Sequence, residues 1–399
     1  MGRSRVMIVG AGPAGAALSL LLARRDIDVT LVEREPDFGR VFRGEALMPS
    51  GLAALYQLGM REALERLPHV VVPCMELYIE GARIVRADWP ELSGNNAAIA
   101  ISQPALIDLL VQEAAATGHF ELRTGTALRA IDTAAAHVRV IIRAGDRDST
   151  LTADAVIGGD GRASTVRALA GIELQRIDFP TNAAWLSLPA PDTQGIDPRF
   201  QAFSRGAELI VLYPSWDGRL RVGLNIARAA GDHSKTRLLE TIASTAGEPY
   251  ATIARSQAAA IPEPVIFKVL AGHAQRWCGD RLLLIGDAAH PMAPVRAQGI
   301  NLALRDAIVA ANHLVPALDT GSGEAITAAA ARVQQEREPE VVAIQQLQLA
   351  AMQLPLPLRS TLLRRTLVPI LRRTGAMKKM ILQSEMPLRH GIANVRIAV

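Results

Sequence analysis

Short apolar runs separated by glycines and charges open the chain. Residues 5–9 and residues 29–32 are rich in valine, isoleucine and leucine, and short apolar runs of this kind are typical of buried strands. The segment from Val6 to Ala23 carries no charge and contains several glycines. The pattern predicts a strand, a glycine turn, a helix and a second strand at the start of the chain.

The rest of the chain changes between helical and β periodicity. Apolar residues on one face predict helices, and strict alternation predicts strands joined by turns. The predicted segments are a helical segment within residues 1–70, strands around a loop rich in Gly and Asn in residues 71–100, a helix at residues 103–117, short strands in residues 121–157 with turns at residues 132–136 and 145–149, alternating strands in residues 172–270 with one helix near residues 235–247, a strand at residues 281–285 and a helix at residues 299–314.

These segments indicate an α/β fold whose first domain is interrupted in sequence. We expect a nucleotide-binding domain in residues 1–70, 101–171 and 272–320, with a β-ribbon beside its parallel sheet. A second, mostly β domain is expected in residues 71–100 and 172–271. Residues 321–399 are expected to form a C-terminal helical, basic segment.

The first glycines have the spacing of a dinucleotide-binding turn. Gly10, Gly12 and Gly15 follow the first strand as G-x-G-x-x-G. In this motif a tight turn, a close approach to pyrophosphate and a close helix–strand contact each exclude a side chain. The next helix directs its N-terminal N–H groups toward that phosphate. Glu33 ends the second strand, where a carboxylate accepts hydrogen bonds from ribose hydroxyls.

An uncharged run behind two arginines is also compatible with a signal peptide or a short membrane span. Glycines and Pro13 at turn positions favour the phosphate-binding turn instead. The β-rich continuation to Glu33 favours it as well, because a signal peptide needs no such segment.

The two cysteines indicate no covalent or metal framework. Cys74 and Cys278 are far apart in the sequence, so neither a disulfide framework, a zinc site nor a redox-active dithiol is indicated. A reduced, cytoplasmic setting is therefore expected.

Charge is unevenly distributed along the chain. The formal net charge is +4, whereas residues 355–399 hold seven Arg and two Lys against Glu385, which gives +8 for this tail. Basic pairs recur there among leucine and isoleucine, as on a basic amphipathic helix. Two interpretations stay open: a solvated face of a helix packed on the protein body, or peripheral docking on anionic lipid. Nucleic acid is not expected, because no aromatic residues interleave with the charges.

Two later motifs place further carboxylates after strands. Residues 154–167 run from a strand into Asp160, and residues 281–307 run from a strand into Asp287 and on to a helix that begins near Gly299. An extended FAD requires such a second carboxylate for its ribityl hydroxyls, and a nicotinamide dinucleotide does not. The helix N-terminus at residues 299–301 would face the flavin pyrimidine ring and stabilise the negative charge of the reduced flavin.

Together these motifs show that the chain resembles the class A flavoprotein monooxygenases, the family of p-hydroxybenzoate hydroxylase and the ubiquinone-pathway hydroxylases. The resemblance covers about residues 5–315 and rests on the glycine motif with Glu33, on Arg43-Gly44-Glu45, on GDG at residues 159–161 and on GDAAHPMAP at residues 286–294. It implies a glutathione-reductase-type FAD-binding Rossmann domain with an inserted, mostly β substrate domain.

The resemblance also implies a reaction. FAD would be bound non-covalently, NADH or NADPH would be the transient reductant, and O2 would be the co-substrate. A flavin C4a-hydroperoxide would hydroxylate or epoxidise an electron-rich compound. The low aromatic content, the apolar chain and the basic tail suggest a lipophilic aromatic substrate of the quinone, quinolone or polyketide type.

Carried over residue by residue, the resemblance implies two groups of site residues. Pro294 and Arg43 are expected at the reacting end of the flavin. The expected cofactor-binding residues are Gly10, Gly12, Ala14, Gly15, Glu33, Arg34, Arg43, Gln103, Asp160, Asp287, Gly299, Ile300 and Asn301. No metal ligand is expected, and His290 is expected to be structural. Four aromatic residues could line the substrate pocket, but buried aromatics are more often core residues, so they are not counted among the site residues: Tyr78, Trp185, Tyr213 and Trp216.

The chain departs from the family pattern at two places. Arg296 and Ala297 stand where the family usually has a small, glycine-rich pair, and Gln103 stands where many members carry Arg. Arg296 is expected to turn outward, with contact to substrate or attraction of nicotinamide phosphate as the alternatives. Gln103 can still donate hydrogen bonds to FAD but brings no charge to its phosphates.

Three other functions share parts of this pattern. A flavin-dependent halogenase needs a lysine beyond a W-x-W-x-I-P segment, and the sequence contains no such segment. A flavin reductase or dehydrogenase acting on a prenyl or quinone substrate shares all three motifs, and oxygen incorporation separates it from a monooxygenase. A non-catalytic flavin-binding protein would hold FAD without being reduced by NAD(P)H.

Overall fold

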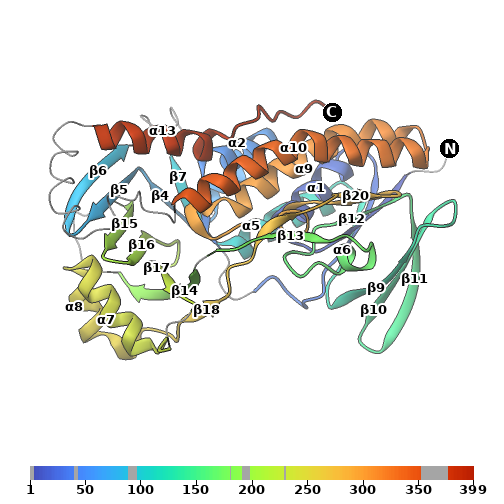
Figure 1. The fold of residues 1–399 in the computed structure, drawn as a ribbon. Helices are drawn as coiled ribbons and strands as arrows, with labels where there is room; N and C mark the ends of the chain where they lie inside the picture. The colour runs from blue at the N-terminus through green and yellow to red at the C-terminus, as the bar shows by residue number, and fades with distance from the viewer. Residues whose placement is uncertain are drawn as a thin grey trace.

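The computed structural model describes residues 4–39, 44–88, 97–179, 181–190, 198–228, 231–351 and 376–399. Two lobes lie side by side beneath a layer of long helices (Figure 1). That layer comprises α9 (Gly299–Asp319), α10 (Gly323–Ala351) and α13 (Ala376–His390). It runs across both lobes, so the C-terminal part of the chain contacts elements from the whole sequence.

The lobe on the right of Figure 1 is built on a mostly parallel sheet. Its strand order is β20-β21-β12-β1-β2-β8. The strands are β1 (Arg5–Val9), β2 (Asp28–Val32), β8 (Phe120–Arg123), β12 (Ala155–Gly158), β20 (Cys278–Gly279) and β21 (Leu282–Leu284). Only the β20–β21 pair is antiparallel among these neighbours. The carboxyl ends of β1, β12 and β21 therefore meet at one edge, the edge at which α/β folds bind ligands.

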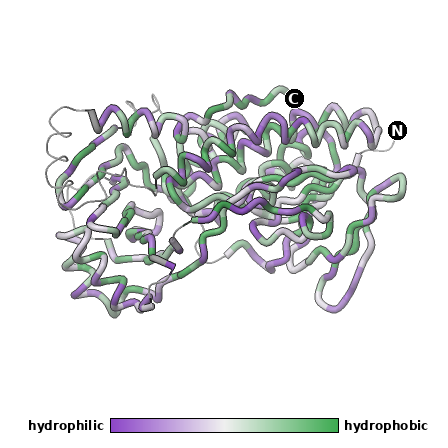
Figure 2. The backbone as a smooth tube through the Cα atoms, viewed as in Figure 1, coloured by the Kyte–Doolittle hydropathy of each residue, from purple (hydrophilic) through white to green (hydrophobic). Residues whose placement is uncertain are grey.

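Helix α1 (Pro13–Ala23) is buried along almost its whole length. It packs against α9 and against α5 (Gln103–Ala115), so its apolar sequence is explained by a covered helix in the protein core. Within the described residues, no helix combines the length and the apolar character needed to cross a membrane. Figure 2 shows hydrophobic and hydrophilic stretches alternating through both lobes and the helical layer, as expected where each element buries one side.

An antiparallel ribbon extends from the parallel sheet, as the alternating pattern predicted. It consists of β9 (Thr126–Asp132), β10 (Val138–Ala144) and β11 (Arg147–Ala153). The second turn is shorter than the predicted turn at residues 145–149, because Gly145 with φ +55° allows a tight connection and pairing resumes at Arg147. The short helix α6 (Thr165–Leu169) follows β12.

The lobe on the left is built on a second sheet of order β18-β14-β17-β16-β15-β5-β6. Its strands are β5 (Cys74–Ile79), β6 (Ala82–Asp88), β14 (Thr181–Pro189), β15 (Arg199–Arg205), β16 (Glu208–Pro214), β17 (Arg219–Ala227) and β18 (Val265–Phe267). Strand β5 pairs with β15 in parallel, which joins residues 74–88 to a sheet formed by residues far along the chain. One face is covered by α7 (Lys235–Ala246) and α8 (Tyr250–Ser256); α8 was not predicted from the sequence.

Smaller elements connect the lobes. One short sheet contains β3 (Ala46–Leu47), β4 (His69–Val72) and β7 (Ala98–Ile101), and another pairs β13 (Leu174–Ile177) with β19 (Ala271–Ala274). Helices α2 (Pro49–Gln57) and α3 (Arg61–Arg66) follow β3, and single turns occur at η1 (Ala258–Ala260), η2 (Gly286–Ala288) and η3 (Val295–Ala297).

Residues 391–399 run as an extended segment over α2, α9 and α10. Glu340 of α10 accepts hydrogen bonds from the backbone N–H groups of Ile392 and Ala393 at 2.6 and 3.2 Å. Gln57 of α2 donates to the Val395 carbonyl oxygen at 3.2 Å. Residues 355–375, which carry most of the predicted basic amphipathic face, lie outside the described residues.

Candidate active site

The turn after β1 contains two close backbone approaches. Gly10 has φ +99°, and a Cβ there would lie 2.5 Å from the Gly159 carbonyl oxygen. A Cβ on Gly15 would lie 2.1 Å from the Gly10 carbonyl oxygen, so the first turn of α1 packs directly on the turn. The fold itself therefore requires glycine at both positions.

Gly12 is different, because the fold leaves room at this position. A Cβ on Gly12 would contact only the Gly159 oxygen, at 3.7 Å, which is an ordinary van der Waals distance. No side chain caps α1 at Gly12, and the first turn contains no acidic residue. An uncapped helix N-terminus beside open space fits the approach of a phosphate.

Glu33 ties the glycine turn to the end of β2. Its Oε2 accepts a hydrogen bond from the Ala11 N–H at 2.9 Å, and its Oε1 accepts one from the Glu35 N–H at 3.0 Å. The contact of Glu33 with a ribose stays a prediction. The neighbouring Arg34 lies on the surface, where it pairs with Glu35 at 3.1 Å.

The turn at Gly286 and Asp287 lies between the first turns of two helices. A Cβ on Gly286, which has φ +58°, would lie 3.2 Å from Ala14 Cβ of α1 and 3.5 Å from Ala303 Cβ of α9. Asp287 Oδ1 lies 3.9 Å from the Cβ position at Gly299, and a third of the Asp287 side chain is exposed. The turn thus places one accessible carboxylate beside the N-terminus of α9, where it can accept hydrogen bonds from a polyhydroxyl chain.

Asn301 uses its side chain to hold α9 in place. Its Oδ1 accepts a hydrogen bond from the Met48 N–H at 2.8 Å, and its Nδ2 donates to the Ala297 carbonyl oxygen at 2.6 Å. A Cβ on Gly51 would lie 2.1 Å from Asn301 Oδ1, so α2 approaches closely here. The side chain is therefore occupied by backbone groups, and Ile300 packs partly against the core. The predicted flavin contact at residues 299–301 would therefore be made by their backbone N–H groups and not by their side chains.

Asp160 caps α6. Its carboxylate accepts hydrogen bonds from the Ser164 hydroxyl at 2.5 Å and from the Thr165 and Val166 N–H groups at 2.6 and 3.1 Å. Burial raises the pKa of the Asp160 carboxyl, although these hydrogen bonds oppose the shift. The residue thereby fixes the loop that packs against Gly10, and its contact with cofactor stays a prediction.

Two arginines that follow Asp160, one in the loop and one in α6, contact the turn at Gly286 and Asp287. Arg167 donates to the Ala288 carbonyl oxygen at 2.7 Å. Arg162 lies with its Nε 3.6 Å from Asp287 Oδ2 and its guanidinium 5.6 Å from the centre of the Phe267 ring. Neither arginine was predicted as a site residue, because only the folded chain brings Arg162 to Asp287 and Arg167 to Ala288.

Pro294 leads into a strained loop ahead of α9. Arg296 and Ala297 have φ +61° and +52°, a region that L-residues rarely adopt and that glycine occupies freely. Arg296 Nε lies 3.1 Å from Oε1 of Glu385 in α13, and its side chain is 23% exposed. The expectation that Arg296 turns outward is wrong, because the C-terminal helix supplies a buried carboxylate for it.

A buried charge network behind the Asp287 turn was not predicted. Asp306 of α9 accepts hydrogen bonds from the Gly286 N–H at 3.0 Å, from His290 Nε2 at 2.5 Å and from Arg337 Nε at 2.8 Å. Burial alone would raise the pKa of the Asp306 carboxyl, but the charges of His290 and Arg337 and their hydrogen bonds lower it to about 2. His290 is structural, as expected, since it is fully buried and its ring lies 4.9 Å from the Trp277 ring.

The second sheet presents an aromatic face away from α7 and α8. Residues 184, 186 and 188 of β14 belong to the core under those helices, so Trp185 lies on the opposite face. The Trp185 and Tyr213 rings lie 6.2 Å apart, and the Phe200 and Tyr213 rings 5.0 Å apart. A Cβ on Gly223 would lie 3.0 Å from the Trp185 ring, so the indole packs directly on β17 at this glycine. Tyr78, in contrast, stacks on Phe203 in the core.

A buried ion pair joins this face to the segment before α2. Arg221 of β17 donates to Glu45 Oε1 through Nε and Nη2 at 3.0 and 2.9 Å, and Ser215 donates to Glu45 Oε2 at 2.6 Å. Burial raises the pKa of the Glu45 carboxyl, and Ser215 and Arg221 oppose that shift. Burial, and then the charge of Glu45, raises the pKa of Tyr213 well above its ordinary value, so the phenol stays protonated.

The remaining predicted residues are placed as follows. Gln103 is the first residue of α5, next to the capping residue Ser102, which accepts a hydrogen bond from the Ala105 N–H at 3.3 Å. Arg43 lies outside the described residues. No cluster of three or more His, Cys, Asp or Glu residues suited to a metal occurs in the part of the chain that the structure describes.

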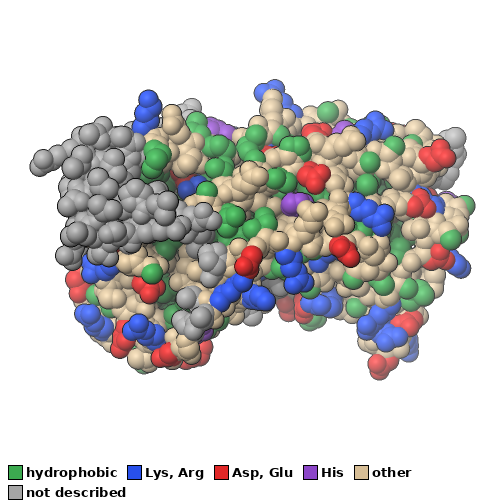
Figure 3. Space-filling model, in the orientation of Figure 1, with side chains coloured by type: hydrophobic (Ala, Val, Ile, Leu, Met, Phe, Trp, Pro, Cys, Tyr) green, Lys and Arg blue, Asp and Glu red, His purple; other side chains and the backbone are tan. Residues whose placement is uncertain are grey.

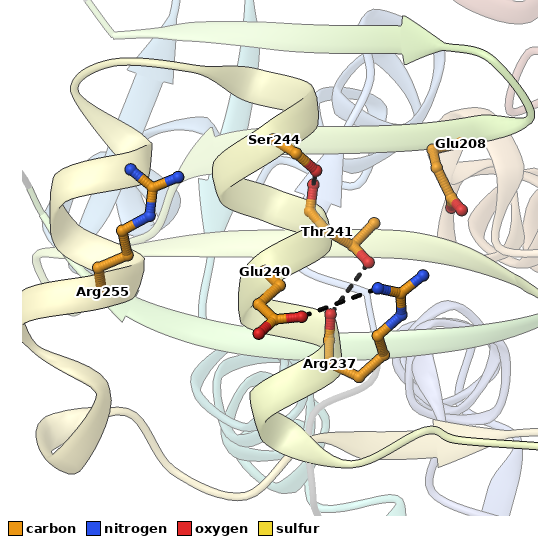
Figure 4. Close-up of a pocket in the computed structure, with 6 residues that line it drawn as sticks. All are labelled: Glu208, Arg237, Glu240, Thr241, Ser244 and Arg255. Carbon is orange, nitrogen blue, oxygen red and sulfur yellow. Dashed lines mark hydrogen bonds and ion pairs between the residues drawn. The ribbon is translucent and has the colours of Figure 1, made fainter.

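A surface cavity of about 400 Å³ lies elsewhere, on α7 and α8. Figure 4 shows its lining, in which Arg237, Glu240 and Thr241 project from one helix and Arg255 from the next. Its walls are charged and hydroxylated side chains, and none of the predicted cofactor residues borders it. It is therefore separate from the site built around Asp287.

Comparison with known proteins identifies the fold and its relatives. Residues 3–346 match the family model described as the FAD binding domain. The 6-methylpretetramide 4-monooxygenase of Streptomyces rimosus is 35% identical over 312 residues, which cover 76% of this chain and 73% of that protein. The 3-hydroxybenzoate 6-hydroxylase of Klebsiella oxytoca is 30% identical over 322 residues, which cover 76% of this chain and 78% of that protein.

A solved structure shows the same fold over nearly the whole chain. The p-nitrophenol 4-monooxygenase PnpA of Pseudomonas putida DLL-E4 superimposes with a TM-score of 0.79 and covers 98% of this chain and 99% of its own, at 20% sequence identity. The two-lobed arrangement with its C-terminal helical layer is thus an established one.

Proposed function

Since the chain belongs to the class A FAD-dependent monooxygenases, we propose that it hydroxylates or epoxidises a lipophilic aromatic compound with NAD(P)H and O2. The observation that carries the proposal is the placement of the Asp287 carboxylate beside the uncapped N-terminus of α9. The uncapped N-terminus of α1 lies on the other side of the same turn. One extended cofactor could contact all three features: a phosphate at α1, a polyhydroxyl chain at Asp287, and a ring that carries negative charge at α9.

The residues present fit FAD. The space at Gly12 and the N-terminus of α1 would hold its pyrophosphate, Asp287 its ribityl hydroxyls, and the backbone N–H groups of residues 299–301 its ring. When bound, the flavin supplies the activation of O2, and NAD(P)H supplies the electrons. The protein contributes position and a dry enclosure. Pro294 borders the expected ring position, and Asn301 fixes the helix that faces it.

The aromatic face of the second sheet supports an aromatic substrate. Trp185, Tyr213 and Phe200 form it, and Gly223 leaves room for the indole of Trp185. Flat aromatic rings pack well on such surfaces. The relatives named above are a 6-methylpretetramide 4-monooxygenase and a 3-hydroxybenzoate 6-hydroxylase. Both names favour a substrate with an electron-rich aromatic ring, and the first favours the polyketide type within the quinone, quinolone or polyketide class proposed here.

Turnover with labelled oxygen tests the proposal. Purified, FAD-loaded protein is mixed with NADH or NADPH in 18O2 and a panel of phenols, quinolones and polyketide aromatics. Substrate-stimulated oxidation of NAD(P)H with 18O in the product is the expected result. Reduction of a prenyl or quinone compound without label would support the reductase function instead, and bound FAD that NAD(P)H never reduces would indicate a non-catalytic flavin protein.

Peripheral lipid contact through residues 355–399 is a separate hypothesis. A lipid-binding face needs basic side chains gathered on one surface. On the face shown in Figure 3, basic and acidic side chains lie next to one another along the lower half, and Arg389 of α13 is used in a buried pair with Glu385 at 2.6 Å. The Arg389 pair favours the packed-helix interpretation for α13, whereas the charges along the lower half of Figure 3 lie outside this helix. Loss of binding to anionic vesicles on removal of residues 355–399 would support lipid docking.

A further inference from the structure

The C-terminal helix contacts the loop that precedes α9 at two points. Glu385 pairs with Arg296 at 3.1 Å, and the Leu388 carbonyl oxygen accepts a hydrogen bond from Gln298 Nε2 at 3.1 Å. Gln348 of α10 adds hydrogen bonds to the Ala293 and Val295 carbonyl oxygens at 3.0 and 2.6 Å. The loop at residues 293–298 is thus held from outside by helices that begin far along the chain.

The same loop is strained from within. Arg296 and Ala297 both have positive φ values, +61° and +52°, and neither is glycine. A backbone in this region persists only where the surroundings hold it. The side chain of Arg296 is directed at Glu385, which is 4% exposed, and Ala297 packs against the same buried cluster as Ile381 and Leu382 of α13.

From this geometry we propose that Glu385 is a positioning residue, which holds Arg296 and Ala297 in the left-handed conformation and thereby sets the N-terminus of α9 for FAD. The proposal rests on the FAD site described above. Asn301 transmits the position, since its Nδ2 donates to the Ala297 carbonyl oxygen at 2.6 Å and its Oδ1 accepts from the Met48 N–H. Movement of Ala297 would therefore shift the backbone N–H groups at residues 299–301.

Helix α13 also connects the loop at residues 293–298 to the second sheet. Met75 and Phe200 of the second sheet pack in the same hydrophobic cluster as Ala297, Ile381 and Leu382. Strand β5, which carries Met75, thereby shares one cluster with the loop and with α13. Helix α13, which carries Glu385, thus shares one hydrophobic cluster with the loop before α9 and with the second sheet.

The test uses FAD affinity and the visible spectrum of bound FAD, so that it does not depend on turnover. Glu385→Gln should weaken FAD binding by about tenfold, the effect expected when a strained loop loses its support, and should shift the flavin absorption bands. Glu336→Gln is the matched control, because Glu336 of α10 pairs with His313 on the surface at 2.8 Å; it should leave both readouts unchanged.

Rescue separates positioning from general destabilisation. Arg296→Gly accepts a positive φ without a partner, so Glu385→Gln combined with Arg296→Gly should recover FAD affinity and spectrum. The loss of the Glu385–Arg389 pair is the same in both variants, so a merely structural role would show no recovery. Unchanged FAD binding in Glu385→Gln, or a loss that Arg296→Gly does not recover, would overturn the proposal.

A second comparison covers the case in which Glu385→Gln does not fold. Arg296→Ala keeps the strain at position 296 and removes the partner, whereas Arg296→Gly removes both at that position; the strain at Ala297 is the same in the two variants. Weaker FAD binding in Arg296→Ala than in Arg296→Gly is the expected result, and equal binding would count against the inference. These experiments measure FAD binding and not monooxygenation. Their outcome therefore does not depend on whether the turnover assay of the proposed function succeeds.

Discussion

At the scale of the residue, glycine is needed at the three positions of the first motif for different physical reasons. Gly10 and Gly15 are required because backbone atoms lie 2.5 and 2.1 Å from where a Cβ would be. Gly12 meets only one oxygen at 3.7 Å, so its small size serves an approaching group rather than the fold. Substitution at each position should therefore have a different consequence.

Gly12→Val and Gly15→Val form a matched pair. Gly12→Val should fold with near wild-type stability but fail to bind FAD, because its side chain collides with the pyrophosphate. Gly15→Val should lose about 3 kcal/mol of unfolding free energy or more, since overpacking against backbone cannot relax easily. Urea unfolding and quenching of flavin fluorescence measure the two effects; a Gly12→Val protein with full FAD occupancy would refute the assignment.

Asp287→Ala tests the carboxylate beside α9. Purified protein should be largely free of flavin, since the hydrogen-bond acceptor for the ribityl chain is lost. Asp319→Ala, at the exposed end of the same helix, is the control and should purify with FAD. The ratio of absorbance at the flavin band to that of protein gives occupancy, and a yellow Asp287→Ala protein would show that the turn is misassigned.

At the scale of the element, a buried charge network joins α9 to α10 behind the Asp287 turn. Asp306, Arg337 and Glu340 are buried, and Arg305 pairs with Glu340 at 2.8 Å. Buried charges need their partners, because an unpaired one keeps its full desolvation penalty. The network therefore fixes the Gly286 turn relative to both helices.

Asp306→Asn should lower the free energy of unfolding at pH 7 by about 3 kcal/mol, the usual effect of breaking a buried pair. The pKa of the Asp306 carboxyl is lowered to about 2 in the folded protein, below its unfolded value of about 3.9. Its stabilisation is thus present above about pH 4 and is lost as the pH falls toward 2. Urea unfolding of both proteins should show their difference shrinking over that range; a constant difference would contradict the assigned pKa shift.

At the scale of the whole molecule, the two lobes are joined through a buried ion pair. Glu45 precedes α2 in the segment beside the first lobe, and Arg221 lies in the second sheet, with Nη2 and Oε1 2.9 Å apart. Asp217 also accepts from Arg221 at 2.8 Å. The pair ties the second sheet to the segment before α2, so it contributes to stability and to the placement of the aromatic face.

Arg221→Met should destabilise the protein by about 3 kcal/mol, because Glu45 stays buried without its main partner. The double variant Arg221→Met with Glu45→Leu should recover a large part of that loss, since two apolar side chains can fill the same space. Urea unfolding of the single and double variants measures the recovery. A double variant no more stable than Arg221→Met alone would show that the pair does not carry the coupling.

Local motifs explain how much of the fold the sequence could predict. The strands at residues 5–9 and 281–285, the helix at residue 103 and the antiparallel ribbon depend on short-range periodicity and turn chemistry, and the structure has all of them. The helix α8 was missed because its seven residues make only about two turns, too few for a helical period to be distinguished from other patterns. The end of α9 was placed five residues early, because Pro316 lies inside the helix.

The sequence by itself determined the dinucleotide-binding turn and the class of cofactor, because glycine spacing and a carboxylate after a strand act over a few residues. Only the tertiary structure decided the partners of Arg296, Asp306 and Arg221. Each partner lies on a separate element: Glu385 is 89 positions from Arg296, Arg337 is 31 from Asp306, and Glu45 is 176 from Arg221. No periodicity relates such positions, since burial of charge is settled only when distant elements pack.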